Sequence, residues 1–451
     1  MCQFANRVLK LWIIFATGLL AIAVPSATAG PLLITNIWPA AGGVALAGSG
    51  GSNNATYHLL SSATLALPST NWPAVATNTF DADGNFILTN PILPGAQFFR
   101  LSVPPATALM PDFSLVGFAT LDGFATNNTL LVGGTTGGAA GPVVVASNLT
   151  WLVNFAQRSN MPLRVLITAD IDCSSLNNNN PAPGYATGRI DLNNNKTIYS
   201  TNGATISRGT LRINGKSNVI IRNLRFRDLY VFDPSGAYDT YGWDYVAVDG
   251  ASHHVWVDHC DFDRVYDGMV DVVNGSDYVT VSWNIFANQK KCSLVGNSDN
   301  ATGDRSKLNV TYHHNWFINV DERTPRMRFG NAHVFNQYTD NRTATNSTGK
   351  CIQATTESAV LVEQVFFTFA TNAYPTVYVN GGGVGNALKV VGSVITNSPG
   401  NRGFAQTNAA TFAFNAPWVT NAPPYSYTLD AVTEVPSVVT NWSGVGKITS
   451  F

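Results

Sequence analysis

The stretch SNVIIRNLRF (217–226) reads as a short alternating strand that ends on an aromatic ring, Phe226. Five later segments share this layout: HHVWVDHCDF (253–262), DYVTVSWNIF (277–286), LNVTYHHNWF (308–317), NAHVFNQY (331–338) and AVLVEQVFF (359–367). Their closing rings follow at intervals of 36, 24, 31, 21 and 29 residues, at Phe262, Phe286, Phe317, Tyr338 and Phe367. A strand that recurs in this way is typical of a solenoid, where each coil buries its apolar face against its neighbours. A sandwich or barrel also has many short strands, but its strands would not all share the same residue pattern with the aromatic ring at the same position.

The composition favours β structure. Only 12% of the 451 residues are charged, and Asn, Thr, Gly and Val are abundant. Such residues favour strands and tight turns over helical bundles. The formal net charge is −1, so a protein of this composition that binds a polyanion must gather its cations locally.

Residues 1–29 have the layout of a secretion signal. Arg7 and Lys10 precede an apolar core (11–24), and Ala27-Thr28-Ala29 follows it. A membrane anchor is the alternative, but this core is shorter than a bilayer-spanning helix needs. No later segment could cross a membrane, so we expect a secreted, extracellular protein with no membrane partner.

Four cysteines remain after removal of the signal, and their spacing fits no dense disulfide scaffold. Their pairing stays open: Cys173, Cys260, Cys292 and Cys351. Cys260 falls at an inward or turn position of a repeat, so we expect a buried free thiol there.

Residues 30–104 form a separate module with only three charged residues and several strand-like runs. Asp83-Gly84 is a turn signal between two of these runs, so we expect a small β-sandwich-like domain. Residues 105–112 contain prolines and are expected to be a linker. The large solenoid domain is expected to span 113–451.

One helix is expected in the large domain, over 148–160, with Asn148 as its cap and an apolar face formed by Trp151, Leu152 and Phe155. A solenoid has open ends, so this helix is expected to cover the first coils. The tail, including YSYTLDAVTEVPSVVTNW (425–442), is expected to pack back along the outside.

Three aspartates could converge on one groove of the solenoid. Asp267 and Asp271 open one repeat, and Asp244 precedes another by about ten residues. Residues on neighbouring coils come about 5 Å apart. Carboxylates this close repel one another unless a cation lies between them, and oxygen ligands without His or Cys favour Ca²⁺ over zinc. Aspartates that only form turns are the alternative.

Six of the seven histidines lie between residues 253 and 333, which suggests a zinc or catalytic site. The pairs His253-His254 and His313-His314 lack the i, i+4 spacing of a helical zinc site. Neighbours in an alternating strand point to opposite faces, so we predict that neither pair chelates one ion. His259 and His314 are predicted to be hydrogen-bonded structural side chains.

The cations form the sharpest pattern. Lys291 lies in KCSLVG, and ERTPRMRFG (322–330) supplies Arg323, Arg326 and Arg328. By parity, Arg326 and Arg328 share one strand face. A solvated run of cations is the usual interpretation of such a segment. Because successive coils of a rigid scaffold offer both cations and carboxylates, we expect both to line one groove.

In this order, WVDHCDF, DGMVDVVNGSDYVTVSWNIF, KCSLVG, VTYHHNWF and ERTPRMRFG resemble the pectate lyases of polysaccharide lyase family 1. The resemblance covers about residues 113–451. It implies a right-handed parallel β-helix with a substrate groove along one face. It also implies a lyase that cleaves de-esterified 1,4-linked polygalacturonate by calcium-assisted β-elimination and leaves 4,5-unsaturated products. We expect a monomer with no nucleic-acid partner.

Matched motif by motif, the family's calcium ligands fall on Asp244, Asp267 and Asp271. Lys291 takes the place of the family's lysine. In the Arg-x-Pro-x-x-Arg signature, Arg323 matches the catalytic base and Arg328 a substrate-binding arginine. A guanidinium normally keeps its proton, so residue type alone would not assign the role of base.

Departures from the family pattern are mild. Cys292 and Ser293 stand where Thr-Met is common, and Gln337 replaces a frequent Asn. Asp267 takes a position that some relatives fill with Glu, and Gly242 stands where some carry a further calcium-binding Asp. The primary ligands are therefore intact, but an extra one is in doubt. Residues 30–104 have no counterpart in the family's minimal domain.

The implied chemistry agrees with the charges. Elimination removes the C5 proton of a uronide, which is acidic because it lies next to the C6 carboxylate. Ca²⁺ and cations on that carboxylate stabilise the negative charge that develops.

Three other functions remain open. A calcium-independent pectin lyase on methyl-esterified pectin would have lost the aspartates, and a non-catalytic polysaccharide-binding β-helix would have lost Lys291 or Arg323. A glycoside hydrolase would need a pair of carboxylates about the glycosidic oxygen.

Overall fold

The computed structural model describes residues 33–448 apart from gaps at 42, 52–54, 63–71, 73, 92–96, 103–109, 125–129, 343–349, 370–375, 380–385 and 397–402. The predicted signal (1–29) and most of the predicted linker lie outside the described residues. The chain divides into two compact units, residues 1–109 and 110–451. The predicted roles of the signal, linker and first module stay predictions.

The first unit contains two three-stranded antiparallel sheets. One has the order β1 (Leu33–Ala40), β2 (Gly43–Ser49), β5 (Phe86–Asn90), and the other the order β4 (Ala74–Thr79), β3 (Thr56–Ser62), β6 (Phe98–Ser102). Leu46 and Leu88 of the first sheet share a core with Tyr57, Leu59 and Leu101 of the second. Residues of both sheets therefore pack face to face, as the predicted β-sandwich-like domain requires.

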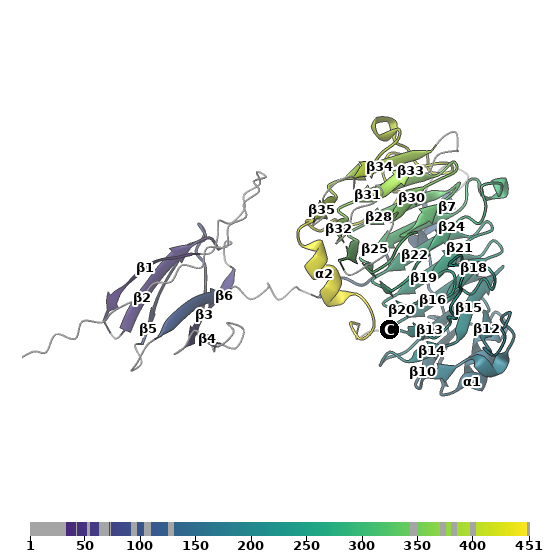
Figure 1. Cartoon of the computed structure of the whole chain (residues 1–451), viewed down its shortest axis with the longest axis horizontal. Helices are drawn as coiled ribbons and strands as arrows, with labels where there is room; N and C mark the ends of the chain where they lie inside the picture. The colour runs from purple at the N-terminus through teal and green to yellow at the C-terminus, as the bar shows by residue number, and fades with distance from the viewer. Residues whose placement is uncertain are drawn as a thin grey trace, which may run out of the picture. The chain divides into compact units, whose positions relative to one another are not determined.

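Three parallel sheets run through the second unit, and neighbouring strands in each sheet are three strands apart in the chain, except at β9–β10. The first sheet contains β9 (Val143–Ala146), β10 (Leu163–Ile167), β13 (Lys196–Tyr199), β16 (Ser217–Arg222), β19 (His253–Asp258), β22 (Asp277–Ser282), β25 (Asn309–His313), β28 (Asn331–Phe335), β31 (Ala359–Glu363) and β34 (Ala387–Val391). The second contains β11 (Ile171–Asp172), β14 (Thr205–Ser207), β17 (Arg225–Arg227), β20 (Asp261–Asp263), β23 (Ile285–Ala287), β26 (Trp316–Ile318), β29 (Tyr338–Asn341), β32 (Phe366–Phe369) and β35 (Val394–Thr396). The third contains β12 (Gly188–Leu192), β15 (Gly209–Asn214), β18 (Val246–Asp249), β21 (Val270–Val272), β24 (Leu294–Val295), β27 (Arg326–Met327), β30 (Ile352–Ala354), β33 (Val377–Val379) and β36 (Phe404–Ala405). Each coil contributes one strand to each sheet, so the predicted parallel β-helix is confirmed (Figure 1).

Each predicted repeat strand consists of two strands separated by a corner. In the first repeat, β16 ends at Arg222, β17 begins at Arg225, and Asn223 between them has a φ of 57°. The equivalent corners of later repeats also have positive φ, at His259, Trp283, His314, Asn336 and Gln364. At each of these corners, a residue in the left-handed conformation turns the chain from the first sheet to the second. Residues with a Cβ rarely adopt this conformation. The prediction of a single strand per repeat is therefore wrong.

Buried asparagines satisfy the backbone beside these corners. Asn284 Nδ2 donates to the carbonyl oxygen of Val257 and to Asn315 Oδ1, both at 3.0 Å. Asn315 Nδ2 donates to the carbonyl oxygen of Val281 at 2.9 Å. Regular sheet pairing is interrupted at a corner, and these amides supply the partners that buried carbonyls need.

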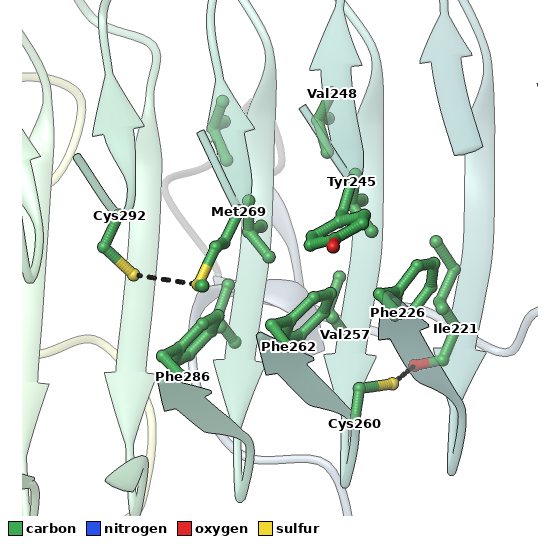
Figure 2. Close-up of a cluster of buried hydrophobic side chains, with 14 of the residues drawn as sticks. Ile221, Phe226, Tyr245, Val248, Val257, Cys260, Phe262, Met269, Phe286 and Cys292 are labelled. Atoms are coloured by element: carbon green, nitrogen blue, oxygen red, sulfur yellow. Dashed lines mark hydrogen bonds between the residues drawn. The ribbon is translucent and has the colours of Figure 1, made fainter. Parts of the chain in front are cut away.

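The closing rings form a stack inside the helix. Phe226, Phe262, Phe286 and Phe317 stack with ring centroids 4.8, 5.0 and 4.9 Å apart in turn, and Figure 2 shows the first three. Tyr338 leaves this row, because Thr339 is the residue that pairs with Phe317 and with Phe367. The inward position of this repeat is therefore one residue later than predicted. The ring of Tyr338 packs against Val435 and Val439 of the tail instead.

The helix α1 (Leu149–Gln157) contacts β9, β10 and β12, at the start of the solenoid. The predicted cap is present, since Asn148 Oδ1 accepts a hydrogen bond from the N–H of Trp151 at 3.1 Å. Leu152 is buried, but Trp151 is 48% exposed and stacks on Phe155. Trp151 therefore does not belong to the buried face, contrary to the prediction.

The tail packs along the outside, as predicted. Tyr425 Oη lies 2.7 Å from Thr311 Oγ1, and Asp430 Oδ2 lies 3.0 Å from His314 Nε2. A second helix, α2 (Val435–Trp442), was not predicted. Among the described residues, no helix has the length and apolar character needed to cross a membrane.

The four cysteines of the described chain are buried and free: Cys173, Cys260, Cys292 and Cys351. The expected buried thiol at Cys260 is confirmed, with its Sγ 3.8 Å from the carbonyl oxygen of Ile221 (Figure 2). Burial raises the pKa of the Cys260 and Cys292 thiols, and that of Cys173 to about 12. Because the thiolate is the reactive form, these thiols are inert.

Candidate active site

The outward row of the third sheet brings Asp271 and Arg326 onto one face. Val272 in β21 pairs with Val295 in β24, so Asp271 stands beside Leu294, which in turn pairs with Arg326 in β27. The residues on either side of this row are buried in the core: Val270, Val272, Val295 and Met327. Strand alternation therefore directs Asp271, Leu294 and Arg326 away from the core.

Asp244 and Asp271 approach each other around Gly268. Asp244 Oδ1 accepts the N–H of Gly268 at 2.7 Å, and Asp271 Oδ1 accepts the N–H of Leu294 at 2.9 Å. A Cβ at position 268 would lie 2.3 Å from Asp271 Oδ1 and 2.7 Å from Asp244 Oδ1. A glycine therefore keeps open the space between the two carboxylates, a role for which the sequence pattern carried no signal.

The pKa shifts of these two carboxyl groups show how strongly they repel a further negative charge. Burial raises the pKa of Asp244 well above its ordinary value, and the negative charges of Asp271 and Asp267 raise it further. Burial, followed by the charge of Asp267, raises the pKa of Asp271 to about 7. The positive charge of Arg323 opposes both shifts. Two carboxyl groups with raised pKa values, close to the charge of Asp267, form an environment that a divalent cation would stabilise.

Asp267 forms an ion pair with Lys291. Lys291 Nζ lies 3.3 Å from Asp267 Oδ1 and donates to the carbonyl oxygen of Tyr238 at 2.8 Å. The Lys291 side chain is only 11% exposed. Tyr238 has a left-handed φ of 52°, and its contribution through a backbone carbonyl left no signal in the sequence.

The described residues contain no group of three or more His, Cys, Asp or Glu side chains close enough to form a ready-made metal site. The predicted trio is divided into a carboxylate pair at Gly268 and an ion-paired Asp267. Calcium takes about six to eight oxygen ligands. The open cradle at Gly268, bordered by oxygen ligands only, fits part of such a coordination shell.

Arg323 is tied to both neighbouring coils through its main chain. Its N–H donates to the carbonyl oxygen of Lys350 at 3.3 Å, and its own carbonyl accepts the N–H of Ser293 at 2.8 Å. Its φ is 65°, and the following Thr324–Pro325 bond is cis. In the described part of the chain, its buried Nε has no hydrogen-bond partner. The guanidinium therefore keeps donors available for a ligand.

Arg328 is already partly engaged. Its Nε donates to Asp299 Oδ1 at 2.7 Å, and its Nη1 donates to the carbonyl oxygen of Gly296 at 2.8 Å. Asp299 also accepts a hydrogen bond from Thr356 Oγ1 at 2.6 Å. These hydrogen bonds from Thr356 and Arg328 hold the pKa of Asp299 below its ordinary value. Asp299, which the sequence analysis missed, thus orients the predicted substrate-binding arginine.

The two histidine pairs are not arranged as alternation predicted. The Nδ1 atoms of His253 and His254 lie 2.6 Å apart, and those of His313 and His314 lie 2.8 Å apart. His254 and His314 have left-handed backbones, so neighbouring rings turn toward each other instead of to opposite faces. The predicted structural role agrees with the geometry at both corners, since His314 contacts Asp430 and His259 contacts Asp258.

The family model described as pectate lyase matches residues 106–448 of the chain. The pectate trisaccharide-lyase of Thermotoga maritima is 35% identical over 271 residues, which cover 57% of this chain and 73% of that protein. The enzyme of the same name from Bacillus licheniformis is 30% identical over 353 residues, 75% of this chain and 88% of its own length. A solved pectate lyase from Paenibacillus sp. 0602 shares the fold, with a TM-score of 0.59 at 24% identity over 75% of this chain and 97% of that one. With this match over most of its length, the chain belongs to the pectate lyase family and is a lyase.

Proposed function

We propose that this protein cleaves de-esterified polygalacturonate by calcium-assisted β-elimination. The observation that carries the proposal is the meeting of opposite charges on one face. The carboxylate pair of Asp244 and Asp271 lies within electrostatic reach of Arg323, whose Nε has no hydrogen-bond partner among the described residues. The names of the relatives, pectate trisaccharide-lyases, point to the same substrate.

Asp244 and Asp271 would hold calcium, with Asp267 as a third ligand once it leaves Lys291. When bound, calcium supplies a positive charge that binds the uronide carboxylate and stabilises the charge that develops on it. Lys291 keeps one donor beyond its bonds to Asp267 and Tyr238, and this donor would bind that carboxylate.

Arg323 accepts the C5 proton in this proposal. The electron pair of the C5–H bond forms the C4–C5 double bond, the C4–O4 bond breaks, and the departing sugar oxygen takes a proton from water. A guanidinium must first lose a proton to act as a base, so turnover is expected to increase under alkaline conditions. The main-chain hydrogen bonds of Arg323 to Lys350 and Ser293 hold its backbone, and with it the Cα from which the side chain extends, in a fixed position. Arg328, oriented by Asp299, would bind a substrate carboxylate through its remaining donors.

The alternatives fit the site less well. A pectin lyase that acts without calcium has no use for a carboxylate pair around Gly268. A binding protein has no need for a partly buried Arg323 beside that pair. Export of the protein is a further part of the proposal and is supported by the charged, apolar and small-residue segments of residues 1–29.

The test is the ultraviolet absorbance of the unsaturated product formed from polygalacturonate, with calcium or with EGTA. Activity that requires calcium is the expected result. Full activity in excess EGTA would remove calcium from the mechanism and favour the pectin-lyase alternative. Absorbance that does not rise under either condition, with a folded protein, would favour the binding protein.

A further inference from the structure

Arg326 is a cation of the same face that has no role in the proposed elimination. It lies in β27, in the outward row that also contains Asp271, with Leu294 between the two. Within the described chain its guanidinium has no salt bridge, and its buried Nε has no hydrogen-bond partner. Arg326 therefore makes no direct ion pair with a carboxylate of the described residues.

The surroundings of Arg326 make this isolation unfavourable. Burial lowers the pKa of Arg326, and the positive charges of Arg328 and Arg323 lower it further. Asp299 opposes the shift, but it is bonded to Arg328 and is 58% exposed. Asp299 is thus the one carboxylate whose charge opposes the lowered pKa of Arg326 among the described residues, and it is already paired with Arg328. An anion from outside would stabilise the half-buried Arg326, because a desolvated charge gains most from a close partner.

We propose that Arg326 binds the carboxylate of the uronide next to the sugar that undergoes elimination, and so forms a second subsite of the groove. The inference rests on the proposed function, which places the reacting sugar between Asp271 and Arg323. Coils are stacked about 4.8 Å apart, a distance comparable with the length of one sugar ring. A polyuronide carries a carboxylate on each ring, so a chain that lies along the row can bring a second carboxylate to Arg326.

The donors of Arg326 suit this ligand. A guanidinium binds a carboxylate through two parallel hydrogen bonds, which fixes its orientation as well as its charge. The row continues from Arg326 to Gln353 and then to the half-buried Tyr378, so it extends beyond Arg326 along the sheet. The subsite is therefore expected on the Tyr378 side of the cleavage point.

The test compares Arg326→Gln with wild type in the full-length protein, on polygalacturonate with calcium. If Arg326 forms a binding subsite, KM of Arg326→Gln should rise about tenfold, because one charged contact with the substrate is lost. Its kcat should change less than about twofold. Arg342→Gln is the matched control, because it removes an exposed cation beside Asp340 of the second sheet and should leave KM unchanged.

Calorimetric binding of trigalacturonate separates this inference from the proposed function. Weaker binding by Arg326→Gln but not by Arg342→Gln supports the subsite even if the wild type shows no turnover. Unchanged KM and unchanged trigalacturonate affinity, in a variant folded by circular dichroism, would overturn it. If Arg326→Gln does not fold, Arg326→Lys replaces it: loss of the two-bond geometry should weaken binding severalfold, and wild-type affinity would refute the subsite.

Discussion

At the residue scale, Arg323 and Arg328 stand in the same motif but differ in their partners. Arg328 donates to Asp299 and to the carbonyl of Gly296. Arg323 is fixed through its main chain, and its Nε has no partner in the part of the chain that the structure describes. An arginine that is already oriented suits binding, and one with a free head group suits proton transfer. The resemblance assigns the same two roles.

Arg323→Lys is therefore expected to leave the fold intact but to remove nearly all turnover, because lysine cannot place a guanidine nitrogen at the C5 proton. Arg328→Ala is expected to raise KM more than it lowers kcat. Steady-state kinetics on polygalacturonate, with circular dichroism as the control for folding, would check both. If Arg323→Lys kept more than about a tenth of the wild-type rate, worth only about 1.4 kcal/mol of barrier, the base would have to be another group.

Asp271 predicts how calcium binding depends on pH. Its pKa, raised to about 7 by burial and by Asp267, means that the calcium-free fold holds a proton there that the unfolded chain releases at lower pH. This group therefore costs the calcium-free protein stability as the pH rises toward 7. Below that value the proton competes with calcium, so calcium should raise Tm more at about pH 8 than at about pH 5.5.

Thermal melts with calcium and with EGTA at both pH values would measure this difference. Asp271→Asn is the control, since an amide cannot titrate, and it should lose most of the calcium effect at either pH. Equal stabilisation of the wild type at both pH values would show that Asp271 does not bind the ion.

At the scale of the elements, the phenylalanine stack holds successive coils of the second sheet together. Phe262 lies between Phe226 and Phe286, with nearly parallel rings on both sides, and is 1% exposed. Phe262→Ala should lower the free energy of unfolding by about 3–5 kcal/mol, since a cavity would open inside the β-helix. Phe232→Ala is the matched control: that ring is 73% exposed, and its loss should change stability by less than about 0.5 kcal/mol.

Denaturant unfolding of the two phenylalanine variants would compare the effects directly. Similar stabilities for Phe262→Ala and Phe232→Ala would mean that the coils do not depend on the stack. In that case, the corner asparagines Asn284 and Asn315 would contribute more to the stability of the coils than the phenylalanines do, through their buried hydrogen bonds to the backbone.

At the scale of the whole molecule, the first unit has its own core and the site residues all lie in the second unit. We expect residues 30–104 to be dispensable for catalysis and to act in attachment or targeting. A chain that begins at Met110 should fold, because α1 contacts the first coils of the solenoid, and should keep its rate on soluble polygalacturonate.

Rate measurements on soluble polymer and binding to insoluble wall material would distinguish the two roles. Loss of binding to the insoluble material alone is the expected result. A truncated chain that is well folded by circular dichroism but inactive on the soluble polymer would show that the first unit contributes to catalysis.

The sequence by itself determined the solenoid and the chemical types at the site. Stacked coils repeat one local environment. The recurrence of the same strand pattern at Phe226, Phe262 and Phe286 therefore predicts the fold even when no contact between distant residues is known. The order of Asp267, Asp271, Lys291 and the arginines likewise predicted that carboxylates and cations would share a face.

The tertiary structure alone decided the corners, the phase of the repeats and the pairing of charges. The left-handed corner at His314 turns its ring toward His313, and Tyr338 leaves the stack because Thr339 takes the inward place. Asp299 reaches Arg328 across a coil boundary, at a separation of 29 residues. Such contacts depend on how loops of different length bring one coil onto the next, and alternation within a strand carries no information about them.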